Sequence, residues 1–83
     1  MSAPQDMDTD TIYIRLLDEG TPVMRPTSGL HHDDDIYRVL PTPDYDPDDE
    51  HWQFPPGSVV RCVKEVRDGQ ELIVAQELFT GRP

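Results

Sequence analysis

The sequence predicts an all-β fold, a small antiparallel barrel of five short strands. Apolar and polar residues alternate in several short stretches, as they do in strands with one buried face. Asp68-Gly69 separates two such stretches, and this dipeptide favours a tight hairpin turn, in which both central residues have positive φ. No stretch shows the three- and four-residue apolar spacing of an amphipathic helix.

The chain length limits the protein to one domain with a modest core, because 83 residues bury only a moderate fraction of their surface. We expect a disordered acidic tail over residues 1–10, the domain over residues 11–79 and a short tail over 80–83. The N-terminus shows no signal peptide, and no apolar run is long enough to span a bilayer. The expected location is therefore the cytoplasm.

The first predicted strand places Ile12, Ile14 and Leu16 on one face, which we expect to enter the core. Pro26 cannot donate a ladder hydrogen bond, so the second strand should be short or lie at an edge, with a loop over 27–35. The predicted strands cover residues 11–18, 23–25, 36–40, 58–66 and 71–78.

Residues 41–51 form a predicted loop, because three prolines in this segment exclude a regular helix or a central strand. The prolines also favour an extended backbone in the residues that precede them. Five short strands are too few for a two-layer sandwich, whereas closing them into an SH3-like barrel removes their exposed edges. The loop would then project from one side of this barrel.

The aromatic residues and the single cysteine are candidates for the core. Trp52 and Phe54 should attach the end of the long loop to the core, and Tyr37 is expected to be buried. Cys62 lies in an apolar run and should behave as a buried hydrophobic residue, with Val60 and Val66 on the same face. Tyr45 is the aromatic residue most expected to be exposed.

Two blocks of the sequence resemble a group of small, uncharacterised bacterial proteins. The first block is YIRLLDEGTPVMRP, residues 13–26, and the second is WQFPPGSVVRC, residues 52–62. Together they cover about 25 of the 83 residues. The resemblance implies a small all-β bacterial domain, and it brings no catalytic motif with it.

The charge of the chain favours a basic partner. Seventeen acidic and seven basic residues give a net charge of −10, which repels nucleic acid and anionic membranes and attracts basic protein surfaces. In an extended loop Asp44, Asp46 and Asp48 would point the same way at intervals of about 6–7 Å, a spacing similar to that of DNA phosphates. The predicted partner-binding residues are Asp33, Asp34, Asp35, Asp44, Tyr45, Asp46, Asp48, Asp49, Glu50 and Trp52.

Three functional interpretations remain open at this stage. The first is a DNA mimic that occupies a nucleic-acid-binding surface, as an anti-CRISPR or other anti-defence inhibitor or as an immunity protein of a nuclease. The second is an SH3-like adaptor that binds a proline-rich peptide through Trp52, Tyr37 and Tyr45. The third is a housekeeping domain whose acidity serves solubility alone.

Metal binding and catalysis are not predicted. A calcium loop starting at Asp44 would need glycine at the position of Asp49 and glutamate at the position of Pro55, so only weak calcium association stays open. The three histidines lack the spacing of a zinc site. Ser28 and Ser58 lie in turn contexts without a nucleophile motif. We therefore expect a protein without enzymatic activity, metal or cofactor.

Overall fold

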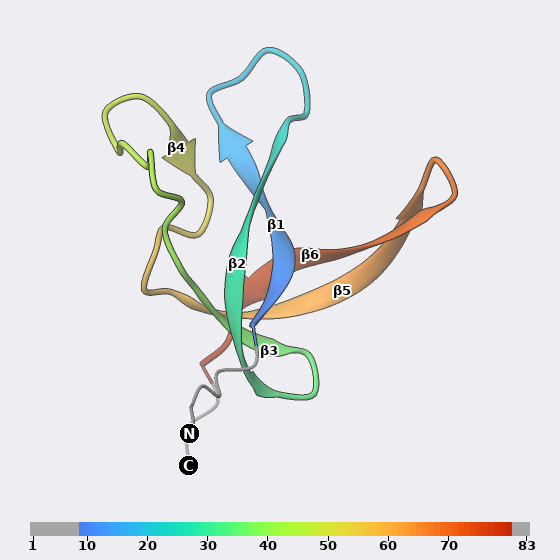
Figure 1. The fold of residues 1–83 in the computed structure, drawn as a ribbon. Coiled ribbons are helices and arrows are strands. Elements are labelled where there is room, and N and C mark those ends of the chain that lie inside the picture. Colours follow the sequence, from blue (N-terminus) through green and yellow to red (C-terminus); the bar gives the residue numbers. More distant parts are fainter. Residues whose placement is uncertain (1–8, 81–83) are drawn as a thin grey trace.

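The computed structural model describes residues 9–80 and consists of strands, turns and loops, with no helix in that range (Figure 1). This confirms the all-β prediction. Thr9 and Asp10 belong to the first strand, so the predicted tail over 1–10 is wrong at these two positions, and its remainder lies outside the described residues. The strands are β1 (Thr9–Leu17), β2 (Met24–Asp33), β3 (Ile36–Val39), β4 (His51–Trp52), β5 (Val59–Arg67) and β6 (Gln70–Leu78).

Five of the strands pair in a closed ring. Antiparallel pairing joins β1 to β2, β2 to β3, β3 to β5 and β5 to β6, and β6 returns to β1. A meander with an odd number of strands ends in the direction in which it began, so the closing pair is parallel. This closure consists of one residue pair, Tyr13 with Val74, while β4 adds to β1 opposite Leu16 and Leu17.

Strand β2 is longer than predicted, because it continues through Pro26 to Asp33. The predicted end of this strand at Arg25 and the predicted loop over 27–35 are therefore wrong. Leu16 N donates to Val23 O over 2.9 Å, so Leu16 and Val23 form a hydrogen-bonded pair, and Pro26 lies three residues further along β2. Bonded and non-bonded pairs alternate in an antiparallel ladder, so Pro26 stands in a non-bonded pair opposite Tyr13, where its missing N–H is not needed.

The core lies inside the ring, and the alternation of β1 is confirmed, because Ile12 and Ile14 are fully buried and Leu16 is half-buried against the same cluster. The predicted burial of Tyr37, Trp52, Phe54 and Cys62 is also confirmed. A further set of buried residues completes the cluster: Val39, Val60 and Ala75.

The β5–β6 hairpin extends beyond the ring as a twisted arm, which we call the ribbon (residues 63–73; Figure 1). Asp68 and Gly69 have φ of 53° and 76°, which confirms the turn predicted from this dipeptide. Val66 lies in the ribbon and is 73% exposed, so its predicted place beside Cys62 in the core is wrong. β3 pairs with β5 only from Val59 to Arg61, and beyond these pairs β5 leaves the body of the protein.

Candidate functional site

The loop between β3 and β4 (residues 41–50), which we call the acidic loop, is attached to the core through an aromatic contact. Tyr45 packs edge-on against Trp52, with ring centroids 4.7 Å apart and ring planes at 67°. Tyr45 is therefore half-buried, and the expectation that it is exposed is wrong. Trp52 is only 4% exposed, so its ring contacts Tyr45 from the side of the core and does not face solvent.

Glu50 attaches the end of the acidic loop to β2. Arg25 donates from Nε to Glu50 Oε1 over 3.1 Å and from Nη2 to Oε2, in a bidentate pair. Trp52 Nε1 donates to Glu50 Oε1 over 3.1 Å. The hydrogen bonds from Arg25 and then Trp52 lower the pKa of Glu50. Because its carboxylate has these internal partners, Glu50 stabilises the loop, and its predicted role toward an external partner loses support.

The backbone of the acidic loop forms turns, so the prediction of an extended row of carboxylates is wrong. Asp46 O accepts hydrogen bonds from the N–H groups of Asp49 and Glu50, both over 3.0 Å. Asp46 Oδ1 accepts from Asp48 N over 2.9 Å. This is the local pattern of a helix N-cap, in which Pro47 follows the capping residue and needs no donor. An earlier turn closes with Tyr45 N donating to Thr42 O.

The aspartates of the acidic loop remain available to a partner. In residues 9–80 every ion pair of an arginine is made with a glutamate: Arg25 with Glu50, Arg61 with Glu77, and Arg15 and Arg67 with Glu65. The exposed aspartates have no such pair. In the acidic loop they are Asp44, Asp46, Asp48 and Asp49.

The other predicted acidic residues, Asp33–Asp35, lie at the turn between β2 and β3, which we call the acidic turn. β3 runs from this turn toward the acidic loop, and the two segments occupy opposite ends of the molecule (Figure 1). Asp34 has a φ of 28°, and Asp35 O accepts a hydrogen bond from Cys62 N over 2.8 Å. The structure therefore divides the predicted partner-binding residues into two separate groups.

The surroundings of His51 and Cys62 bear on the metal and nucleophile interpretations. No group of three potential metal-ligating side chains converges within residues 9–80. His51 Nδ1 lies 2.7 Å from Asp18 Oδ2, which connects β4 with the turn after β1. Burial, with a smaller effect from Asp35, raises the pKa of Cys62 to about 11, so this thiol is protonated at neutral pH.

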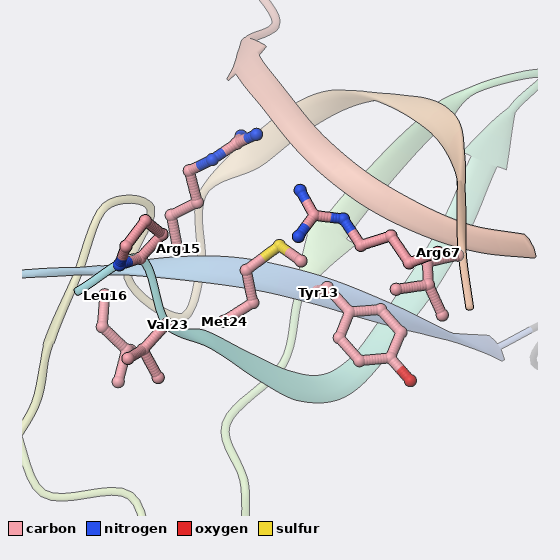
Figure 2. Close-up of a pocket in the computed structure, with 8 residues that line it drawn as sticks. Tyr13, Arg15, Leu16, Val23, Met24 and Arg67 are labelled. Atoms are coloured by element: carbon pink, nitrogen blue, oxygen red, sulfur yellow. The ribbon is translucent and has the colours of Figure 1, made fainter. Parts of the chain in front are cut away.

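A pocket that the sequence did not indicate lies between the β1–β2 hairpin and the ribbon (Figure 2). It has a volume of about 310 Å³ and combines apolar side chains with two arginines. Its residues come from four strands and a turn, so no local motif joins them. They are Tyr13, Arg15, Leu16, Pro22, Val23, Met24, Arg67 and Leu72.

Comparisons of the chain with protein-family models, with curated proteins and with solved structures found no match. In the part of the chain that the structure describes, no helix has the length and apolar character needed to cross a membrane.

Proposed function

We propose that this protein is a non-enzymatic binding protein whose acidic loop occupies a basic, nucleic-acid-binding surface of a partner protein. The observation that carries the proposal is that four exposed aspartates lie in one ordered loop and make no ion pair with an arginine or lysine of residues 9–80: Asp44, Asp46, Asp48 and Asp49. In this proposal the ring of strands acts as an SH3-like barrel that supports the loop.

The attachment of the acidic loop supports this function. Tyr45, Asp46 and Glu50 each hold the loop through a contact that the free protein already makes. A loop that is ordered before binding loses less conformational entropy when a partner docks, which favours affinity. The net charge of −10 would accelerate association with a basic surface and would repel nucleic acid itself.

The carboxylates are clustered by turns, so the mimicry proposed here reproduces the charge density of a phosphate backbone without its linear spacing. An anti-CRISPR or other anti-defence inhibitor and a nuclease immunity protein both fit this chemistry. The adaptor interpretation is less well supported, because the rings of Trp52 and Tyr37 are buried and form no exposed aromatic groove for a proline-rich peptide.

The test uses two triple variants that remove equal charge from the two ends of the molecule. The first is Asp44→Asn/Asp48→Asn/Asp49→Asn in the acidic loop, with Asp46 kept because it caps the turn. The matched control is Asp33→Asn/Asp34→Asn/Asp35→Asn in the acidic turn. Each protein is immobilised, exposed to bacterial lysate at low salt and eluted first with duplex DNA and then with about 0.5 M sodium chloride.

We expect the wild type and the control to retain basic nucleic-acid-binding proteins that duplex DNA releases. The loop variant should retain at least about tenfold less of the same proteins, because several charge-assisted contacts are lost together. Equal retention by all three proteins, or partners that neither DNA nor salt releases, would show that the acidic loop is not the binding site.

A further inference from the structure

The pocket between the β1–β2 hairpin and the ribbon lies on the outer face of the ring. Ile12 and Ile14 point into the core, so the alternation of β1 places Tyr13 and Arg15 on the opposite face. The ring closes through the single pair of Tyr13 with Val74, and the ribbon diverges from β1 beyond it. This divergence leaves the hollow of about 310 Å³ that Figure 2 shows.

The floor of the pocket is apolar and accessible. Pro22 and Val23 at its edge are exposed, and Leu16, Met24 and Leu72 are half-buried. Exposed apolar side chains around a hollow are typical of binding surfaces, because a partner removes them from water. The apolar lining residues are Leu16, Pro22, Val23, Met24 and Leu72, together with the ring of Tyr13.

Two arginines at the rim share one carboxylate. Arg67 donates to Glu65 Oε1 from Nε over 3.1 Å and from Nη2 over 2.9 Å, and Arg15 Nη2 lies 3.5 Å from Glu65 Oε2. Figure 2 shows both guanidinium groups on the same side of β1, with the Met24 side chain between them. Each guanidinium has five N–H donors, so both keep donors that Glu65 does not use. These two arginines and the one glutamate together carry a net charge of +1 in a strongly acidic protein.

One edge of the neighbouring strand is also free. Within the described residues β6 pairs with β1 only at Val74, so the edge of residues 70–73 that faces β1 makes no ladder. Unpaired N–H and C=O groups on such an edge accept an added strand of another chain. Leu72, which belongs to this part of β6, also lines the pocket. An extended segment lying here would meet the strand edge, the apolar floor and the two arginines together.

We propose that this pocket docks an extended segment of a partner protein in which an acidic side chain and an apolar one stand two positions apart, so that both point to the same face. The acidic side chain bridges Arg15 and Arg67, and the apolar side chain covers Met24 and Leu72. Charge complementarity favours this occupant, because an arginine fork binds a carboxylate in a bidentate manner. The site is independent of the proposed function, since a basic surface that attracts the acidic loop would be repelled by this rim.

The test is a titration followed by amide chemical shifts in two-dimensional NMR spectra. The probe is the peptide acetyl-Leu-Thr-Glu-Thr-Leu-amide, whose glutamate and leucines share one face when the chain is extended, and its control is the same peptide with glutamine in place of glutamate. We expect shifts confined to the pocket and the adjoining edge of β6, and binding at least about tenfold weaker for the glutamine peptide. Shifts scattered over the molecule, or equal affinity for the two peptides, would overturn the proposal.

Protein variants give an independent reading of the same site. Arg15→Gln/Arg67→Gln should weaken binding of the glutamate peptide by about tenfold or more, whereas Arg38→Gln, which removes an exposed arginine outside the pocket, should leave it unchanged. Both arginines of the pocket are 40% or more exposed, so their loss should leave the fold intact.

Glu65→Gln supplies the sharpest outcome, because it removes the internal carboxylate that competes with the ligand. Binding of the glutamate peptide should become several-fold tighter, by about threefold to tenfold. Unchanged or weaker binding would contradict the proposed bridge.

Two measurements distinguish other occupants of the pocket. Equally tight binding of octanoate would assign the pocket to a free carboxylate, and loss of a wild-type dimer in Arg15→Gln/Arg67→Gln would assign it to a second copy of this chain. Either result would overturn the proposal of a partner segment.

Discussion

The acidic loop and the acidic turn contain the same kind of residue but are held in different ways. The turn, Asp33–Asp35, is fixed mainly by its backbone, through the pairing of β2 with β3 and the bond from Cys62 N to Asp35 O. The loop, residues 41–50, is fixed by side chains, through Tyr45 on Trp52 and the contacts of Glu50 with Arg25 and Trp52.

This difference shows how aspartates can serve two purposes in one chain. In the turn, Asp34 adopts a positive φ that aspartate tolerates better than most residues, so its identity suits the backbone. In the loop, Asp44, Asp48 and Asp49 have no ion pair with an arginine or lysine among residues 9–80, and other residues supply the attachment. Substitutions of side chains should therefore disturb the loop more than the turn.

The largest expected effect comes from Trp52→Ala. This change empties a buried site and also removes the support of Tyr45 and the donor to Glu50, so the free energy of unfolding should fall by about 3–5 kcal/mol. A urea titration measures the loss. Trp52→Phe should cost less, about 1–2 kcal/mol, because it keeps an aromatic ring and loses the hydrogen bond. Equal losses for the two variants would contradict the role assigned to the hydrogen bond.

The second effect tests the backbone packing of β2, the strand that leads to the acidic turn. A Cβ on Gly29 would lie 2.8 Å from Ile12 Cδ1, so Gly29→Ala should destabilise the protein by about 1–3 kcal/mol through overpacking. Ile12→Val removes that methyl group, and the double variant should be more stable than the sum of the two single losses predicts. If the two single losses of unfolding free energy add up to the loss of the double variant in chemical denaturation, the clash is not one between residue 29 and the Ile12 methyl group.

The third effect concerns the pH dependence of the contact that Glu50 makes for the acidic loop. The pKa of Glu50 is lowered in the folded state by Arg25 and Trp52, so its stabilising contribution is present above the ordinary glutamate pKa of about 4.3 and is lost as pH falls through the folded value. Glu50→Gln should cost about 1 kcal/mol at pH 7 and less at pH 3, measured by denaturation at both pH values. A difference that does not change with pH would contradict the ion pair.

The smallest effect concerns the cap in the acidic loop. Asp46→Ala removes the acceptor of Asp48 N and should cost about 0.5–1 kcal/mol in thermal or chemical unfolding. Asp46→Asn should change stability by only a few tenths of a kcal/mol, because asparagine caps equally well. In the acidic turn, Asp34→Gly should be neutral within about 0.5 kcal/mol, since glycine accepts the positive φ while adding freedom to the unfolded chain.

The features predicted correctly from the sequence depend on local patterns. The Asp68-Gly69 turn and the burial of alternate residues such as Ile12 and Ile14 follow from neighbouring residues alone. The length of β2 could not be predicted in this way. Pro26 is tolerated because of its register opposite Tyr13, and that register depends on the pairing of two strands.

The candidate site was predicted in composition and not in geometry. The aspartates of the acidic loop are exposed as expected, but the turn at Asp46 and the pair of Arg25 with Glu50 replace an extended segment with a folded one. The pairing residues are 25 positions apart, so no local spacing indicates their contact. Arg15 and Arg67 are still further apart in sequence, which explains why the pocket left no recognisable motif.

The single pair that closes the ring has a consequence for how the chain folds. Neighbouring strands pair through hairpins of short sequence separation, whereas Tyr13 and Val74 come from opposite ends of the domain. Contacts between distant residues form late, because the entropy of closing a long segment must be overcome first. The seam between β1 and β6 should therefore form last during folding. The Tyr13 amide faces β6, because Tyr13 makes no ladder hydrogen bond with Pro26, so hydrogen exchange at this amide should report opening of the seam before the hairpins separate.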